Sequence, residues 1–130
     1  MSDQVHFNGD ALPLSGLRAL ARGAPLSLAP EVFARVDEAA EIVASIVRKG
    51  EAVYGINTGF GKLANVRIAD SDLETLQRNL VLSHAAGVGE HVSGPIVRLM
   101  MALKLISLGR GASGIRRETL KLLHGMLLGG

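Results

Sequence analysis

The segment at residues 29–50, APEVFARVDEAAEIVASIVRKG, most constrains the fold. Pro30 stands where the first turn of a helix tolerates proline, and Gly50 stands where a helix commonly ends. Apolar residues recur between them every three or four positions, as a helix of 3.6 residues per turn requires. They are Val32, Val36, Ala39, Val43, Ile46 and Val47, and the opposite face carries Glu31, Arg35, Glu38, Glu41 and Arg48. The pattern predicts an amphipathic helix that buries one stripe.

Other segments also carry helix signals. Residues 71–74 read SDLE, which matches a capping box, and they predict a helix running to about Ala86. Pro95 predicts the start of a helix over residues 95–109, and a last helix is expected from about Ser113. The chain is 48% hydrophobic but only 3% aromatic, so its core must be aliphatic. We therefore expect a mainly α fold.

The first residues predict a short extended start. Residues 4–14 are expected to be extended, with a short hairpin turning at residues 8–10, which read NGD. Ser15 is expected to cap a short helix that stops at Gly23. Residues 51–70 break the helical period and are expected to form a glycine-rich loop.

Composition and charge exclude several classes of function. The net charge is +2 and aromatic residues are few, so neither a basic surface nor a base-stacking platform for nucleic acid is indicated. Cysteine is absent, which excludes a disulfide framework and a thiol nucleophile and favours a cytosolic setting. The most apolar stretch, residues 95–109, is too short to span a bilayer and carries Arg98 and Lys104. Because it is apolar around most of its circumference, it is expected inside a larger helical bundle.

The glycine-rich stretch YGINTGFGKL, residues 54–63, raises the question of a phosphate site. A P-loop reads G-x-x-x-x-G-K-S/T, but here Ile56 stands at the first glycine and Leu63 at the hydroxyl position. Residues 59–64 fit the looser dinucleotide fingerprint, yet they lack the preceding strand and the later acid that it needs. The stretch therefore does not indicate nucleotide binding.

Tyr54 and His84 each have a structural and a functional interpretation. A lone tyrosine usually packs and donates one hydrogen bond, whereas a phenol on a mobile loop can act as an acid or a base. His84 follows Ser83 near the end of the helix expected from residue 71. The four histidines form no H-x-x-x-H or H-E-x-x-H pair, so no metal site is expected. A lone histidine usually has a structural role. Spacing alone does not determine the role of Tyr54 or of His84.

Three stretches together resemble a known family. They are VYGINTGFGKLANVRI (residues 53–68), LQRNLVLSHAAGVGE (76–90) and VRLMMALKLISLGRGASGIRRETL (97–120). They are similar to the N-terminal part of histidine ammonia-lyases, within the wider family of aromatic amino acid ammonia-lyases and aminomutases. The resemblance covers nearly the whole chain, and the stretch Tyr-Gly-x-Asn-Thr-Gly-Phe-Gly is its most specific part.

The resemblance implies a helical enzyme that removes ammonia from an amino acid. Members of the family are mostly helical homotetramers whose active sites combine several subunits. Their electrophile, 4-methylidene-imidazole-5-one (MIO), forms from an internal Ala-Ser-Gly. By resemblance, Tyr54 is the catalytic base that takes the β-proton, and Ser83 and His84 help to bind the substrate. The loop that carries Tyr54 over the site comprises Gly55, Asn57, Thr58, Gly59, Phe60 and Gly61.

Ser83 and His84 also bear on the choice of substrate. Histidine lyases resemble one another in having Ser-His there, while tyrosine lyases are closer to His-Leu and phenylalanine lyases to Phe-Leu. An imidazole at position 84 suits a polar substrate, since an apolar competitor would leave it unpaired. The expected reaction is L-histidine to trans-urocanate and ammonia. The alternatives are a lyase or aminomutase acting on tyrosine or phenylalanine, and a non-enzymatic helical interaction module derived from the lyase.

Ala112, Ser113 and Gly114 could be mistaken for the MIO precursor. In the family that triad precedes Asp-Leu, whereas here it lies between Arg-Gly and Ile-Arg-Arg. This context resembles a segment that precedes the cofactor segment in the family. A helix break with Ser113 as the cap is the better interpretation, and no cofactor is expected in this chain.

By the same resemblance, residues 1–130 are expected to be an N-terminal segment, a single partial domain, of a longer lyase. Residues 51–70 form its tyrosine loop, and the MIO-forming and C-terminal regions are expected to lie outside it. The segment alone is expected to be inactive. The full enzyme is expected to be a cytosolic homo-oligomer, a tetramer as in the family, that takes L-histidine and has no nucleic acid or membrane partner.

Overall fold

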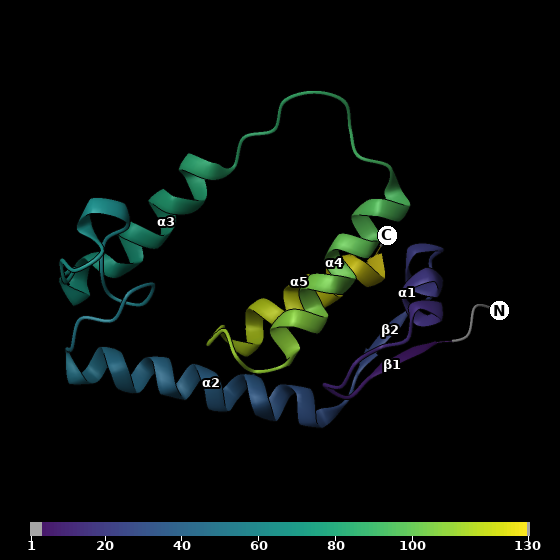
Figure 1. The fold of residues 1–130 in the computed structure, drawn as a ribbon, viewed down its shortest axis with the longest axis horizontal. Coiled ribbons are helices and arrows are strands. Elements are labelled where there is room, and N and C mark those ends of the chain that lie inside the picture. Colours follow the sequence, from purple (N-terminus) through teal and green to yellow (C-terminus); the bar gives the residue numbers. More distant parts are fainter. Residues whose placement is uncertain (1–3, 130) are drawn as a thin grey trace. The chain divides into compact units, whose positions relative to one another are not determined.

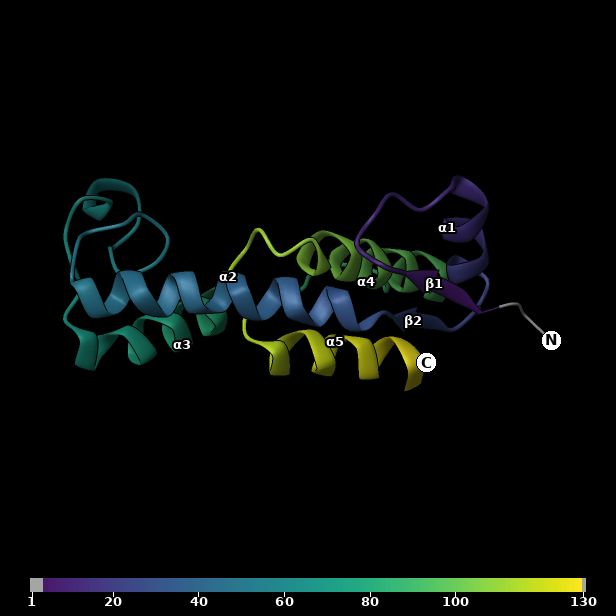
Figure 2. The ribbon, with the colours of Figure 1, turned by 90° about the horizontal axis from the view of Figure 1, so that it is seen from below.

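The computed structural model describes residues 4–129 and shows five α-helices and two short strands in that range (Figures 1 and 2). The helices are α1 (Leu14–Ala21), α2 (Pro30–Lys49), α3 (Leu73–His84), α4 (Gly94–Gly109) and α5 (Arg117–Gly129). The strands are β1 (Val5–Phe7) and β2 (Leu26–Leu28), and two 3₁₀ turns, η1 (Gly61–Leu63) and η2 (Asp70–Asp72), lie between α2 and α3. The mainly α fold is confirmed.

The chain divides into two compact units. The larger unit joins residues 1–41 to residues 91–130, and the smaller unit is the continuous stretch 42–90. In the larger unit α4 packs against both α1 and α5. Its buried core is aliphatic apart from one phenylalanine, as the composition predicted, and comprises Phe7, Leu20, Leu26, Val32, Val36, Ala102, Leu105, Ile106, Leu108, Leu120 and Leu127. Removing such side chains from water, at about 25 cal/mol per Å² of apolar surface, is the main favourable term in folding.

The extended start is a strand, but its partner differs from the one predicted. β1 pairs in parallel with β2, and Val5 lies opposite Leu26. The hairpin predicted at residues 8–10 is therefore wrong. Asn8 does turn the chain, since its side-chain Oδ1 accepts the backbone N–H of Asp10 at 3.0 Å. A parallel pair needs a crossover connection between its strands, and α1 supplies it.

α2 has the boundaries that its sequence predicted, and the first half of the predicted apolar stripe is buried, while Val43, Ile46 and Val47 are half-buried. It begins at Pro30 and ends one residue before Gly50, whose φ of +73° suits glycine. Val32, Val36 and Ala39 are buried. The charged residues of the opposite face, Glu31, Arg35, Glu38, Glu41 and Arg48, are all exposed.

Three predicted serine caps are wrong. Ser15 lies inside α1, and Ser113 lies in the connection before α5. Ser71 lies in η2, where its hydroxyl donates to the Asp72 carboxylate at 3.3 Å instead of capping α3. A cap contributes about 1 kcal/mol, so the packing of neighbouring segments readily moves a helix start by a few residues.

Arg98 connects three segments of the larger unit. Its guanidinium donates from Nε to the Leu20 carbonyl at 3.2 Å, from Nη1 to Leu127 at 3.0 Å and from Nη2 to Ala24 at 3.3 Å. Leu20 and Leu127 lie in the last turns of α1 and α5, where a cation is favourable. The Leu20 carbonyl also accepts the Gly23 N–H at 3.1 Å. The apolar pattern of residues 95–109 gave no sign of this role.

Gly109 and Gly111 let the end of α4 approach β1 and α2 closely. A Cβ on Gly109 would come within 2.8 Å of the side chains of Phe7 and Val32. A Cβ on Gly111 would come within 2.6 Å of the Arg35 carbonyl oxygen, and Gly111 has a φ of +74°. These approaches leave no room for a side chain at either position.

The ion pair between Asp37 and Arg117 joins α2 to α5. Arg117 donates from Nε to Asp37 Oδ1 at 3.0 Å, and its guanidinium carbon lies 5.1 Å from the centre of the Phe33 ring. Hydrogen bonding from Arg117, together with the positive charges of Arg117 and Lys121, lowers the pKa of Asp37 below its ordinary value of 3.8. Since the folded-state pKa lies below the unfolded one, the stabilisation is present above 3.8 and is lost as the pH falls through the lowered pKa.

Replacing Asp37 with asparagine is therefore expected to reduce the free energy of unfolding slightly at neutral pH, because exposed pairs contribute little. The difference from the unsubstituted protein should shrink as the pH falls below 3.8. Urea unfolding at a series of pH values measures it. Arg117→Gln and the double variant complete a cycle that isolates the pair. A difference that stays constant across this pH range would contradict the role assigned to the pair.

Candidate active site

A tight turn of the smaller unit carries Tyr54. The carbonyl oxygen of Val53 accepts the backbone N–H of Asn57 at 3.3 Å. Gly55 has a φ of +81°, which a residue with a side chain adopts only at a cost. Tyr54 is 64% exposed, and its ring lies edge-on to Phe60 with 5.9 Å between the ring centres. The phenol is thus presented outward from a hydrogen-bonded turn.

Asn57 and Thr58 are the buried polar residues of this loop, at 0% and 2% exposure. The side-chain Oδ1 of Asn57 accepts the Val53 N–H at 2.8 Å, and its Nδ2 donates to the Glu51 carbonyl at 2.8 Å. The Thr58 hydroxyl donates to the Gly59 carbonyl at 3.0 Å. Both side chains are satisfied, as buried polar groups normally are.

The second half of the loop pairs with the chain that leads toward α3. Thr58 and Arg67 form an antiparallel bridge, and the Gly59 N–H donates to the Val66 carbonyl at 3.1 Å. Arg67 also pairs with Asp70 at 3.0 Å. A phosphate cradle needs convergent free N–H groups, whereas these amides bond within the loop.

Ser83 and His84 are the last two residues of α3, and both are exposed. The Ser83 hydroxyl donates to the Leu80 carbonyl at 3.0 Å, and Nδ1 of His84 lies 2.8 Å from the same oxygen and 3.0 Å from the Ser83 hydroxyl. A carbonyl oxygen only accepts, so Nδ1 must carry a proton. In the neutral ring, Nε2 is then an acceptor that points away from this contact.

The structure does not bring Tyr54 and the pair of Ser83 and His84 together. The ring contact of Tyr54 is with Phe60, and the described contacts of His84 are with Ser83 and Leu80. η2 leads from the loop into α3, and His84 is at the far end of this helix (Figure 1). Twelve helical residues span roughly 18 Å. The described contacts therefore do not join Tyr54 to this pair.

Two other histidines have structural contacts. His124 donates from Nε2 to the Leu26 carbonyl at 2.7 Å, and Nδ1 of His6 lies 2.5 Å from the Ser27 hydroxyl across the strand pair. Within residues 4–129, no three His, Asp or Glu side chains gather closely enough to hold a metal ion. No helix in the same range is both long and apolar enough to cross a membrane.

Ala112, Ser113 and Gly114 lie in the connection between α4 and α5, so the predicted helix break is present there. Ala112 and Ser113 are exposed. The position of the triad agrees with a helix break, which is the interpretation that its sequence context favours.

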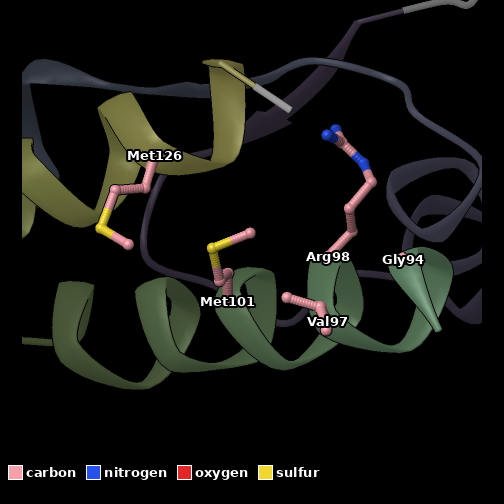
Figure 3. A pocket seen from close by; sticks show the side chains of 5 residues that line it. All are labelled: Gly94, Val97, Arg98, Met101 and Met126. Atoms are coloured by element: carbon pink, nitrogen blue, oxygen red, sulfur yellow. The ribbon is translucent and has the colours of Figure 1, made fainter. Parts of the chain in front are cut away.

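A pocket of about 570 Å³ in the larger unit was not predicted from the sequence. Figure 3 shows Met101 of α4 facing Met126 of α5, with Val97, Arg98 and Gly94 farther along α4. Its lining is apolar apart from Arg98, whose guanidinium already bonds to three carbonyls. The candidate site residues are not among its lining residues, so it offers no acid–base chemistry. A lone arginine in an apolar helix was the signal that could have indicated it.

Comparison with known proteins identifies the family. Residues 12–130 match the aromatic amino acid lyase family. The chain belongs to this family. The motifs at residues 53–68 and 76–90 therefore pointed to the correct group.

Solved structures of several family enzymes are similar to this lyase segment. Histidine ammonia-lyase from Trypanosoma cruzi is 37% identical, with a TM-score of 0.85 over 98% of this chain. Tyrosine aminomutase from Streptomyces globisporus is 30% identical, with a TM-score of 0.88 over 97%. Ergothionase from Treponema denticola, an ergothioneine-degrading enzyme, is 27% identical, with a TM-score of 0.90 over 97%. The chain spans about a quarter of these structures, covering 25%, 24% and 26% of them. These enzymes are named for different substrates and reactions. Family membership therefore does not identify the substrate, which must be inferred from residues of the site.

Proposed function

We propose that this segment supplies the catalytic base and a substrate-binding pair to an ammonia-lyase that converts L-histidine into trans-urocanate and ammonia. The observation that carries the proposal is the pair of Ser83 and His84 at the end of α3. Nδ1 of His84 is held by the Leu80 carbonyl, which leaves Nε2 free to accept a hydrogen bond. An imidazole N–H of L-histidine is a suitable donor to it.

Tyr54 is proposed as the base. In the elimination, the phenolate oxygen takes the β-proton, the electrons of that C–H bond form the double bond between Cα and Cβ, and the C–N bond to the amino group breaks. A phenol acts as a base only when it is ionised and shielded from water, so Tyr54 must be covered in the whole enzyme. Its 64% exposure on a hydrogen-bonded turn leaves it accessible to such a covering segment.

MIO is the electrophile that the family resemblance implies, and it is proposed to come from outside residues 1–130. The triad at residues 112–114 is followed by Ile-Arg-Arg instead of the Asp-Leu that follows the precursor in the family. The proposal therefore assigns to this segment the base and the substrate contact alone. Residues 1–130 produced alone are expected to lack lyase activity for this reason.

A larger, homotetrameric assembly in the cytosol is also part of the proposal. It is supported by large apolar side chains that are exposed on α4 and α5: Ile96, Val97, Met100, Leu103, Leu122, Met126 and Leu128. Apolar surface of this extent usually marks a region that is covered by another segment or subunit.

The test of substrate choice is a comparison of kcat/KM for L-histidine, L-tyrosine and L-phenylalanine in the full-length gene product. L-Histidine is expected to be preferred, with urocanate detected by its ultraviolet absorbance. His84→Leu is expected to lower kcat/KM for L-histidine by about 10-fold to 100-fold, because a polar group of the bound substrate loses its partner. His91→Leu, the same change at another exposed histidine, is the matched control.

A tyrosine-acting enzyme is the second candidate. A phenol O–H can also donate to Nε2 of His84, and tyrosine aminomutase is among the similar structures. Preference for L-tyrosine, with coumarate or β-tyrosine as product, would favour this candidate over the histidine lyase. Turnover of none of the three amino acids would favour a non-enzymatic interaction module.

A further inference from the structure

We infer that Asn57 is a positioning residue for Tyr54, and that its carboxamide fixes the direction in which the Tyr54 side chain leaves the loop. The inference rests on the proposed function, because it assigns a role relative to the proposed base. It assigns the turn around Tyr54 a fixed shape.

Tyr54 has little packing of its own to hold it. Its side chain is 64% exposed, and its ring contact is an edge-on approach to Phe60, which is itself 41% exposed. The direction of the phenol therefore depends on the backbone dihedral angles of the turn. The groups that hold this backbone are the ones that place the base.

The side chain of Asn57 bonds to the backbone on the N-terminal side of Tyr54. Its Oδ1 accepts the N–H of Val53, the residue directly before Tyr54, and its Nδ2 donates to the carbonyl of Glu51. Both distances are 2.8 Å. The carboxamide thus fixes the stretch of chain that enters the turn.

The backbone of Asn57 holds the other side of the same turn. Its N–H donates to the Val53 carbonyl at 3.3 Å, and its carbonyl accepts the Ile68 N–H at 2.8 Å. The backbone N–H, the backbone carbonyl, Oδ1 and Nδ2 of Asn57 therefore each form a hydrogen bond, and the residue is fully buried. Asn57 therefore connects the start of the turn, the end of the turn and the segment at Ile68. Tyr54 lies in the sequence between the bonded positions 53 and 57.

The neighbouring Thr58 does not share this role. It is equally buried, but its hydroxyl bonds to the carbonyl of the next residue, Gly59. An amide side chain of this length offers an uncharged acceptor and an uncharged donor at every pH. Aspartate has the same shape and keeps the acceptor, but when ionised it lacks the donor to Glu51.

Asn57→Asp in the full-length enzyme tests the inference. With the introduced carboxylate ionised, kcat is expected to fall about 10-fold to 100-fold, because a small misplacement of a catalytic group has effects of this size. KM is expected to stay within about twofold, since substrate contacts are unchanged. Once protonated, the introduced carboxylic acid can again accept from Val53 and donate to Glu51. The ratio of variant to wild-type kcat is therefore expected to rise as the pH is lowered. Protonation also restores some stability, so the positioning role requires kcat to recover by more than the folded fraction of the variant does.

Asn65→Asp is the matched control, because it makes the same change at an exposed position of the same loop region. Its kcat ratio is expected to stay near one at every pH. Asn57→Ala, which removes both hydrogen bonds, is expected to lose kcat with no recovery at low pH. Circular dichroism and urea unfolding give the folded fraction of each variant.

The outcomes separate the positioning role of Asn57 from the proposed function. If wild-type enzyme is active and Tyr54→Phe is not, but Asn57→Asp keeps its kcat, the positioning role is wrong and the proposed function stands. The positioning role is equally wrong if kcat falls only in proportion to the folded fraction, or if the loss does not depend on pH. If Tyr54→Phe retains full activity, or the wild-type enzyme turns over no aromatic amino acid, the proposed function itself fails and the inference fails with it.

Discussion

Replacing Tyr54 with phenylalanine is expected to lower kcat of the full-length enzyme by about 100-fold to 10 000-fold, the usual contribution of a positioned acid or base. KM is expected to change little, because the phenol acts on the proton that is removed in the transition state. The ring is retained, so its edge-on contact with Phe60 is kept. The effect therefore reports on the hydroxyl alone.

Steady-state kinetics at saturating amino acid measure this result, and urea unfolding shows whether the variant is as stable as the parent. Tyr54 is the single tyrosine in the sequence, so no other tyrosine in this segment can take its place. A variant that retains kcat within about threefold would show that another group removes the proton. The base would then have to be sought outside this loop.

Replacing Gly111 with alanine is expected to destabilise the larger unit by at least about 3 kcal/mol. The added Cβ would lie 2.6 Å from the carbonyl oxygen of Arg35, and backbone cannot move aside as the end of a flexible side chain can. The φ of +74° at Gly111 adds the cost of a left-handed conformation. Clash and strain act together at one position of the connection between α4 and α5.

Gly125→Ala is the matched control, because it makes the same change in the interior of α5 with no atom within 4 Å of the new Cβ. It is expected to stabilise the protein by about 0.5–1 kcal/mol, since alanine favours a helix over glycine. Urea unfolding of both variants measures the difference, with the slope m as a check that the same surface is exposed. Equal stability of the two variants would contradict the close approach at Gly111.

Local signals predicted α2 well because Pro30, Gly50 and the apolar stripe act within one segment. They failed where contacts between distant segments determine the local structure. β1 pairs with β2 rather than with residues next to it in the sequence, so the asparagine–glycine turn after it does not make a hairpin. The serine caps failed for a related reason, because a contribution of about 1 kcal/mol is too small to fix a helix start against packing.

At the candidate site, too, local features could be predicted and long-range features could not. Its residue types could be read from the motif around Tyr54 and from Ser83 and His84. Their separation could not, since it depends on the path of the loop and the length of α3. The buried carboxamide of Asn57 was also beyond sequence reasoning, because a polar residue in a glycine-rich loop is normally expected at the surface.

Because the larger unit consists of two separate stretches of sequence, it can fold only after the second stretch has been synthesised. Arg98 bonds to Leu20 and Ala24, which are synthesised long before it, and to Leu127, which is synthesised after it. A ribosome adds roughly 5 to 20 residues per second, so the first stretch waits several seconds for its partners. During that time the apolar side chains of β1, α1 and β2 have no core to enter, while the smaller unit, being continuous, is already complete. The stretch at residues 4–41 is thus expected to acquire its core contacts only after residues 91–129 have been synthesised.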